Sequence, residues 1–373
     1  MPLAIFLKQY FAANKKYGAR DRKQIASLCY NYLRLGFSSR DISDHERILI
    51  GTFLFENQPT DLIEYLRPDW NKRITQSFKK KNLIVKNEFS LSKVFPFQNE
   101  LSEEIGFEDF CKSFFVRPGV FLRIRPKTRI GVLKKLERLK SEYKLIDEDC
   151  IELPNSINVE DFFIIDKEVV IQDYNSQKVL DFFKPQYSTT EVLPVKAWDC
   201  CAASGGKSIL LFDIFNHRIE LTVSDIRSSI ILNLHQRFKK AGIKSYYYFI
   251  SDLCNNELQD IEKSHISSSQ VIIFDVPCTG SGTWSRTPEQ LYFFDHKTID
   301  MFSNEQKKIV SNVVPYLEKN GLFVYITCSV FKRENEDIVK FIVEKFQLQL
   351  VQMQLLKGYD KKADTMFVAI LKK

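Results

Sequence analysis

Residues 197–208 of this chain read AWDCCAASGGKS, and the fold is organised around this stretch. Apolar residues lead up to Asp199, small residues follow it, and a second apolar run begins at Ile209. This pattern predicts a strand, a tight turn and the start of a helix. Small side chains let a ligand approach backbone N–H groups at the positive end of the helix, and Asp199 can hold a cation or a hydroxyl. The stretch therefore predicts the first crossover of a nucleotide-type site.

The same loop narrows the choice of ligand without deciding it. Gly206-Lys207-Ser208 imitates the end of a phosphate-binding P-loop, but Cys201 stands where the leading glycine of that motif would fall. The GxGxxG fingerprint of dinucleotide enzymes is also missing. An S-adenosylmethionine loop is favoured, while an NTPase loop, a dinucleotide site and a purely structural turn stay open. The loop residues expected to bind a cofactor are Cys201, Ala202, Ala203, Ser204, Gly205, Gly206 and Lys207.

Composition limits the class of protein. The chain has 373 residues, of which 44% are hydrophobic and 27% charged, as in globular proteins of two or three domains. It has no signal-peptide pattern and no run of about 18 uncharged apolar residues, so we expect a cytoplasmic protein that does not enter a membrane. Its eight cysteines include no CxxC pair, so we expect free thiols and no metal site. We also expect a monomer.

The N-terminal part, residues 1–100, is predicted to form a helical domain because apolar residues recur there at helical spacing. Examples are Leu3, Leu7 and Phe11. The first 40 positions are strongly basic and include Arg20 and Arg22. Such a charge run forms either a solvated helical face or a surface that binds the phosphates of RNA.

Residues 101–165 are predicted to form a small α+β module. Apolar and basic residues alternate as in a strand, and a basic helical pattern follows. The residues that could contact RNA phosphates are Arg117, Arg123, Arg125 and Lys127. An edge strand kept soluble by arginines explains the pattern equally well.

Residues 166–373 alternate between apolar strands and helices, which predicts a Rossmann-like domain with a mostly parallel sheet covered on both faces. The strands are expected at 192–199, 219–224, 246–250, 271–275, 322–326 and 366–371. The helices are expected at 206–216, 228–241, 301–318 and 334–346. Ligands of such folds bind at the carboxyl ends of the strands.

Two acidic residues stand at the predicted ends of the second and third strands. Asp225, followed by Arg227, lies about 20 residues after the glycine turn, where a carboxylate binds ribose hydroxyls. Asp252 could accept a hydrogen bond from an adenine amino group. Either acid could instead cap a helix.

The next two strands end in reactive groups. The fourth reads VIIFDVPCTGSGTW and brings Asp275 and Cys278 to its end, and the fifth brings Cys328 to the same edge. A lone buried cysteine is usually a small apolar residue. Two cysteines beside a cofactor loop favour nucleophilic chemistry, provided that a base or a helix N-terminus activates one thiol.

These motifs, taken together, resemble the RNA cytosine-C5 methyltransferases of the RsmB and Nol/Sun type. The resemblance is carried by Asp199-x-Cys201-Ala202-Ala203-x-Gly205-Gly206-Lys207, by Asp275-x-Pro277-Cys278-x-Gly280-x-Gly282, and by Thr327-Cys328-Ser329 with Glu334-Asn335-Glu336. It covers residues from about 165 to the end and is weak before 110. It implies a Rossmann-like S-adenosylmethionine-dependent methyltransferase domain, preceded by a small α+β RNA-binding module and an N-terminal helical domain.

The resemblance also implies roles for individual residues. Cys328 would add to C6 of cytosine, Cys278 would assist loss of the C5 proton and enzyme release, and Asp275 would hydrogen-bond the base. Residues expected to hold S-adenosylmethionine outside the loop are Asp225, Arg227, Asp252 and Asp275. The partner would be RNA, with ribosomal RNA favoured over tRNA.

Two departures and two alternatives accompany this interpretation. Ser204 stands where the family usually has proline, which loosens the cofactor loop, and Asp364-Thr365-Met366-Phe367 replaces an Asp-Gly-Phe-Phe pattern at the sheet edge. A DNA cytosine-C5 methyltransferase would have its nucleophile at position 278, so the cysteine at 328 favours the RNA class. A non-catalytic RNA-binding ribosome assembly factor would not need both cysteines and Asp275.

Overall fold

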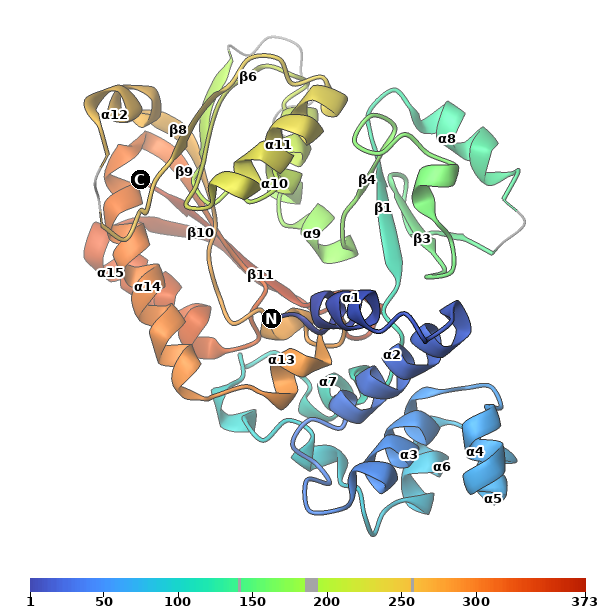
Figure 1. The fold of residues 1–373 in the computed structure, drawn as a ribbon. Helices are drawn as coiled ribbons and strands as arrows, with labels where there is room; N and C mark the ends of the chain where they lie inside the picture. Colours follow the sequence, from blue (N-terminus) through green and yellow to red (C-terminus); the bar gives the residue numbers. More distant parts are fainter. Residues whose placement is uncertain (140–141, 185–193, 256–257) are drawn as a thin grey trace. The chain divides into compact units, whose positions relative to one another are not determined.

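The computed structural model describes residues 1–139, 142–184, 194–255 and 258–373 of the chain (Figure 1). These residues form two compact units. Unit 1 consists of Met1–Pro118 and Gly280–Thr298, and unit 2 consists of Gly119–Thr279 and Ile299–Lys373. The chain therefore leaves unit 2 directly after Thr279 and returns to it at Ile299.

Unit 1 is helical, as the spacing of its apolar residues predicts. Local capping fixes where its two main helices begin: Asp21 accepts a hydrogen bond from the Gly18 N–H (3.0 Å), and Ser43 accepts one from the Glu46 N–H (3.3 Å). Its α-helices are α1 (Leu3–Ala13), α2 (Ala19–Arg34), α3 (Asp44–Phe55), α4 (Asp61–Leu66), α5 (Pro68–Asn71), α6 (Phe78–Ile84), α7 (Phe107–Ser113) and α13 (Pro288–Tyr292). Short 3-10 helices are η1 (Leu91–Lys93), η2 (Gln98–Glu100) and η5 (Ser281–Thr283).

Unit 2 contains a small antiparallel sheet with the strand order β2-β3-β1-β4. Its strands are β1 (Val120–Ile124), β2 (Lys144–Leu145), β3 (Cys150–Leu153) and β4 (Val169–Ile171). Helix α8 (Arg129–Leu136) packs on this sheet through Val132 and Leu136, which are fully buried. The predicted succession of a strand and a basic helix is therefore present as β1 and α8. The 3-10 helix η3 (Val159–Asp161) precedes β4.

The domain boundaries expected from the sequence differ from the compact units. Helical structure continues past residue 100 to α7, because Phe110 and Cys111 are buried in unit 1. The small sheet continues past residue 165, since its strand β4 begins at Val169. It also belongs to the same unit as the large sheet, whereas Gly280–Thr298 belongs to unit 1.

The second sheet of unit 2 has seven strands in the order β10-β11-β9-β8-β5-β6-β7. They are β5 (Val195–Asp199), β6 (Ile219–Asp225), β7 (Tyr247–Ile250), β8 (Ser269–Asp275), β9 (Leu317–Thr327), β10 (Gln349–Leu356) and β11 (Met366–Lys372). Strand β11 pairs antiparallel with both β9 and β10, and the other four pairings are parallel. The predicted mostly parallel sheet is confirmed.

Helices cover both faces of this sheet (Figure 1). On one side lie α10 (Gly206–Ile214) and α11 (Ser228–Ala241), and on the other lie α12 (Asp260–Ile266), α14 (Lys297–Val313) and α15 (Glu336–Phe346). Shorter helical turns are α9 (Tyr174–Lys178), η4 (Asp181–Phe183), η6 (Val314–Tyr316) and η7 (Lys332–Glu334). The core between α10 and the sheet includes Leu211, Ala197 and Ile273.

The strand order creates one switch point. From β5 the chain moves outward to β6 and β7, and then returns to β8 on the other side of β5. Right-handed crossovers put the connecting helices of these two halves on opposite faces, so the carboxyl ends of β5 and β8 border an open crevice. The cofactor loop after Asp199 and the cysteine loop after Asp275 both begin at this crevice.

Edge elements account for the main differences from the predicted elements. Strand β10 was not predicted, because six of its eight residues are exposed and carry no clear buried face. The predicted start of the first strand at 192–193 lies outside the described residues, and the strand begins at Val195. Within the described part of the chain, none of the helices combines the length and apolar character that a membrane span requires.

Candidate active site

The cofactor loop, Cys200–Gly205, is a tight turn between β5 and α10. Ala203 (φ 46°) and Gly205 (φ 80°) both have left-handed backbone conformations. A Cβ atom on Gly205 would lie 2.6 Å from Cε1 of Phe238, so glycine is required there both for its conformation and for space. The Ala202 N–H donates to the Ser224 carbonyl (2.9 Å), which ties the loop to β6. The small residues noted in the sequence thus make a compact turn at the start of a helix.

Asp225 lies at the end of β6 and supports the same loop. It accepts a hydrogen bond from the Ala203 N–H (3.0 Å) and an ion pair from Arg227 (2.9 Å). Burial by itself would raise the pKa of Asp225, but the hydrogen bonds and charge of Arg227 outweigh burial and lower it. The carboxylate is therefore ionised at neutral pH, as a group that binds ribose hydroxyls requires.

Asp252 follows β7 and is partly buried. Its carboxylate accepts hydrogen bonds from the Cys254 N–H (2.9 Å) and from the side chain of Asn255 (2.9 Å). In this structure the residue stabilises a turn, which is close to the capping role that the sequence left open. Its role in adenine binding stays a prediction.

Asp199 and Lys207 flank the loop, at the end of β5 and in the first turn of α10. Asp199 is fully buried, and burial raises its pKa to about 7. Its Oδ2 accepts a hydrogen bond from Ser208 (2.6 Å), whereas its Oδ1 has no hydrogen-bond partner among the described residues. Lys207 donates to Oδ2 of Asp275 at 2.5 Å. Burial would lower the pKa of Lys207, but the charge of Asp275 raises it, so the ammonium group stays protonated.

This arrangement fits S-adenosylmethionine. The unpartnered buried oxygen of Asp199 is suited to a ligand that brings a positively charged amino group, since a buried acceptor without a donor is costly. The backbone N–H groups of the tight loop and the ionised Asp225 lie at neighbouring strand ends. A dinucleotide or a triphosphate would bring extra negative charge to a crevice that already contains three carboxylates, those of Asp199, Asp225 and Asp275.

The two cysteines predicted to react lie side by side. Cys278 follows β8 and Cys328 follows β9, and these strands pair in parallel, so their carboxyl ends adjoin. The two Sγ atoms are 3.5 Å apart. The hydrogen bond with Cys328, together with burial, raises the pKa of Cys278 well above its usual range. Cys328 is also close enough to Lys207 to contribute to the raised pKa of that lysine, so the cysteines lie near the Lys207–Asp275 pair.

A buried carboxylate, Glu334, joins the two cysteine loops. It accepts hydrogen bonds from the N–H and the hydroxyl of Thr279 (2.8 and 2.6 Å), from the hydroxyl of Ser329 (2.5 Å) and from Gln306 (3.4 Å). Thr279 directly follows Cys278, and Ser329 directly follows Cys328. One side chain therefore fixes the spacing of both thiols. The sequence identified Glu334 only as part of a motif that opens a helix.

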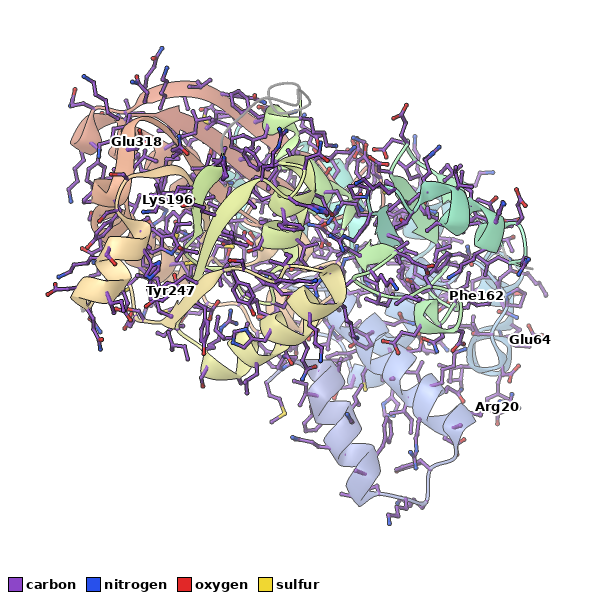
Figure 2. The ribbon with its side chains drawn as sticks, turned by 90° about the horizontal axis from the view of Figure 1, so that it is seen from above. Arg20, Glu64, Phe162, Lys196, Tyr247 and Glu318 are labelled. Carbon is purple, nitrogen blue, oxygen red and sulfur yellow. The ribbon has the colours of Figure 1, made fainter. Side chains whose placement is uncertain are left out.

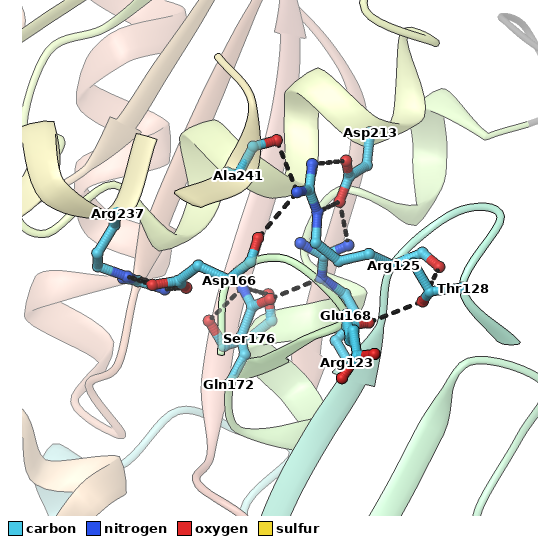
Figure 3. Close-up of polar contacts among 10 residues, drawn as sticks. All are labelled: Arg123, Arg125, Thr128, Asp166, Glu168, Gln172, Ser176, Asp213, Arg237 and Ala241. Atoms are coloured by element: carbon cyan, nitrogen blue, oxygen red, sulfur yellow. Dashed lines mark hydrogen bonds and ion pairs between the residues drawn. The ribbon is translucent and has the colours of Figure 1, made fainter. Parts of the chain in front are cut away.

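Two of the residues expected to contact RNA are buried, which corrects that prediction. Arg123 and Arg125 on β1 are 5% and 7% exposed. Both bind Asp213 of α10, at 2.7 and 2.6 Å, and Arg125 also donates to the carbonyls of Asp166 and Ala241 (Figure 3). The alternation of apolar and basic residues on this strand reflects a buried ion-pair cluster rather than an RNA-binding face. Sequence alone could not show this, because Asp213 lies about 90 positions away.

The other basic residues lie at the surface of their own units. In unit 1, Arg20 is exposed on α2 (Figure 2) and pairs with Asp61, and the side chain of Arg117 is 60% exposed near Glu56. The partly buried Arg22 donates to the Tyr17 carbonyl (2.8 Å). In unit 2, Lys127 is exposed in the turn between β1 and α8. Their contact with RNA stays a prediction.

The strand order, the tight loop at the switch point and the acidic residues at the strand ends define the class of S-adenosylmethionine-dependent methyltransferases. Residues 191–371 match the family described as 16S rRNA methyltransferase RsmB/F. This match confirms the resemblance that the motifs indicated for the C-terminal part of the chain.

Several proteins are similar to this chain. It is 23% identical over 257 residues to a protein of Bacillus subtilis named probable ribosomal RNA small subunit methyltransferase B, covering 66% of this chain and 54% of that protein. It is 26% identical over 160 residues to ribosomal RNA small subunit methyltransferase F of Shewanella loihica, covering 43% of this chain and 32% of that protein. The chain thus spans only about a third to a half of the length of these relatives.

Two solved structures share the fold. The crystal structure of PH0851 aligns with a TM-score of 0.71 and 16% identity, covering 98% of this chain and 93% of that one. NSun6 from Pyrococcus horikoshii aligns with a TM-score of 0.58 and 14% identity, covering 74% of this chain and 96% of that one. At these identities, the similarity shows the fold alone.

Proposed function

We propose that this chain is an S-adenosylmethionine-dependent RNA (cytosine-C5) methyltransferase that acts on ribosomal RNA. The observation that carries the proposal is the 3.5 Å separation of the Cys278 and Cys328 thiols beside the Lys207–Asp275 pair. The names of the relatives, which are ribosomal RNA methyltransferases, support the choice of RNA.

The reaction begins at Cys328. Cytosine C5 is a poor nucleophile, but addition of the Cys328 thiolate to C6 raises the electron density at C5. Asp275 accepts a hydrogen bond from the exocyclic amine and shares a proton with N3 as the adduct forms. Since these atoms lie inside an RNA stack, the base must be unstacked first.

Bound S-adenosylmethionine supplies an electrophilic methyl group, and Asp199, Asp225 and the loop N–H groups would hold it. C5 of the adduct would accept this methyl group: the new carbon–carbon bond would form as the methyl–sulfur bond breaks, and S-adenosylhomocysteine would leave. Loss of the C5 proton then restores the double bond as the bond from C6 to Cys328 breaks, and Cys328 leaves as the thiolate.

Cys278 is suited to remove that proton. Its pKa is raised chiefly by the hydrogen bond to Cys328, with burial and the charge of Cys328 adding to it. Once Cys328 is bonded to carbon, its charge no longer raises the pKa of Cys278, so the Cys278 thiol can release its own proton to solvent and then accept the C5 proton as the thiolate. The pair of thiols therefore alternates: one is the nucleophile while the other stays protonated.

The proposal is tested by bisulfite sequencing of total RNA from cells with and without the gene. We expect one or more ribosomal cytosines to lose their 5-methyl mark when the gene is deleted. Retention of every mark, or loss restricted to tRNA, would contradict the ribosomal substrate.

A second experiment tests the division of labour between the cysteines. Purified Cys278→Ala, incubated with RNA and S-adenosylmethionine, is expected to accumulate a covalent RNA adduct that survives denaturing electrophoresis. The double variant Cys278→Ala/Cys328→Ala is the control and is expected to form none. An adduct in the double variant would reject Cys328 as the nucleophile.

A further inference from the structure

Arg237 on α11 contacts the cofactor loop with one of its three guanidinium nitrogens. Its Nη1 donates to the carbonyl of Ser204 (3.0 Å) and to the hydroxyl of Ser204 (2.9 Å). The same nitrogen lies 3.7 Å from the position that a Cβ of Gly206 would occupy. The guanidinium group therefore borders the loop over Ser204–Gly206, directly before helix α10 begins.

The other two nitrogens of Arg237 are fixed by Asp166. Nε lies 3.1 Å from both carboxylate oxygens and Nη2 lies 2.8 Å from Oδ1, so the ion pair is bidentate (Figure 3). The side chain of Asp166 is 3% exposed and that of Arg237 is 22% exposed. A bidentate pair that is mostly shielded from water holds the guanidinium plane in one orientation. Nη1 is thereby aimed at Ser204.

Asp166 belongs to the small sheet of unit 2, in the turn before β4. Its N–H donates to the Val169 carbonyl (2.7 Å), and its carbonyl accepts from Arg125 (2.8 Å). Arg125 also binds Asp213, near the end of α10. The small sheet thus holds the helix that follows the cofactor loop at both ends: near its end through Asp213, and before its start through Asp166, Arg237 and Ser204.

We propose that Arg237 is a positioning residue for S-adenosylmethionine binding, and that through Asp166 the small sheet fixes the conformation of the cofactor loop. The conformation of the loop decides which of its backbone groups face the ligand, and such groups bind well only when they are held in place before the ligand arrives. Ala203 and Gly205 flank Ser204 in left-handed conformations, so the segment is a strained turn that requires an external support.

The test is calorimetric titration with S-adenosylhomocysteine, which measures cofactor-site affinity without RNA or turnover. Arg237→Met removes both hydrogen bonds to Ser204, and we expect its affinity to fall by about tenfold or more. Arg237→Lys keeps the charge and one donor and is expected to recover part of this loss. Lys240→Met, an exposed change on the same helix, is the matched control and is expected to bind as the unmodified chain does.

A double-mutant cycle separates positioning from a general effect on folding. Ser204→Ala removes only the hydroxyl and is expected to weaken binding by a few-fold. In the Arg237→Met background the same change should add nothing, because its partner is already absent. Ser204→Ala also tests the proposal should Arg237→Met fail to fold.

Three results would overturn the proposal: unchanged affinity in Arg237→Met, additive effects of the two changes, or unchanged affinity in Ser204→Ala alone. If the unmodified chain bound no S-adenosylhomocysteine, the cofactor assignment itself would fail. Loss of RNA methylation with normal cofactor affinity would instead bear on the proposed function only.

Discussion

Unit 2 contains two clusters in which acidic and basic side chains pair. The two clusters differ in how far their side chains are exposed to solvent. In the arginine cluster, Arg123, Arg125 and Asp213 have side chains that are 3–7% exposed. At the strand ends, the side chains of Lys207 and Asp275 are 12% and 28% exposed. The first cluster stabilises the packing of two sheets, and the second leaves groups open to a ligand. Exposure therefore distinguishes the Lys207–Asp275 pair from the structural arginine cluster.

The largest effect is expected at the reactive edge, by which we mean the strand ends that carry Asp275, Cys278 and Cys328. Cys328→Ala should reduce RNA methylation by at least about 10³-fold, because it removes the thiol that is proposed to add to C6. RNA binding and thermal stability should stay unchanged. The measurement is methyl transfer to RNA from labelled S-adenosylmethionine, with Cys254→Ala as a control cysteine away from the edge. Full activity in Cys328→Ala would contradict the assignment of this edge as the reactive cluster.

The arginine cluster should respond in stability instead. Asp213→Ala leaves two buried guanidinium groups without their carboxylate and is expected to lower the free energy of unfolding by about 3–5 kcal/mol. Urea unfolding measures this. Asp61→Ala, which breaks the exposed pair with Arg20, is the control, with an expected change below about 1 kcal/mol. If both variants lost the same free energy of unfolding, the buried arginine cluster would contribute no more to stability than an exposed ion pair.

Glu334 is a fully buried carboxylate that we expect to support activity by fixing the positions of the two cysteine loops. Glu334→Ala removes the acceptor shared by Thr279 and Ser329, so the thiols lose their fixed spacing and activity is expected to fall by about 10²-fold. Glu334→Gln keeps one acceptor oxygen and should lose less. Asp337→Ala, an exposed change on α15, is the control for methyl transfer. A loss of stability without loss of activity per folded molecule would assign Glu334 to structure alone.

Cofactor binding at the strand ends is expected to depend on pH through the charge of Asp199. Burial raises the pKa of Asp199 to about 7, so its charge is lost as the pH falls through neutrality. Affinity for S-adenosylhomocysteine should therefore weaken from pH 8 to pH 6, approaching about tenfold per pH unit below the pKa. Asp199→Asn should bind weakly at both pH values. A pH profile that is the same in Asp199→Asn and the unmodified chain would exclude Asp199 as the titrating group.

The smallest effect is expected at an exposed basic residue of the small sheet. Lys127→Ala should weaken RNA binding by only a few-fold and lower the salt dependence by about one unit, since it removes a single phosphate contact. Filter binding at several salt concentrations measures both quantities. An unchanged salt slope would leave Lys127 as a solvated surface charge.

Much of the fold followed from local patterns. The predicted helix at 228–241 coincides with α11, because its apolar residues recur at helical spacing and Gly242 ends it in a left-handed conformation. The strands around Asp199 and Asp275 followed from short apolar runs bounded by turn residues. Strand β10 and the division into compact units could not be predicted in the same way, because both depend on pairings between distant segments.

The motifs predicted that Cys278, Cys328 and Asp275 lie at one edge of the sheet. Each follows or ends a strand, and the carboxyl ends of parallel strands lie at the same edge. By itself, the sequence determined the class of fold, the family and the groups available for chemistry, because these depend on the order and spacing of residues along the chain. Only the tertiary structure decided which arginines are buried, which acid joins the cysteine loops and what supports Ser204. Those outcomes depend on burial and on partners as far apart as 90 positions, and neither is written in local sequence.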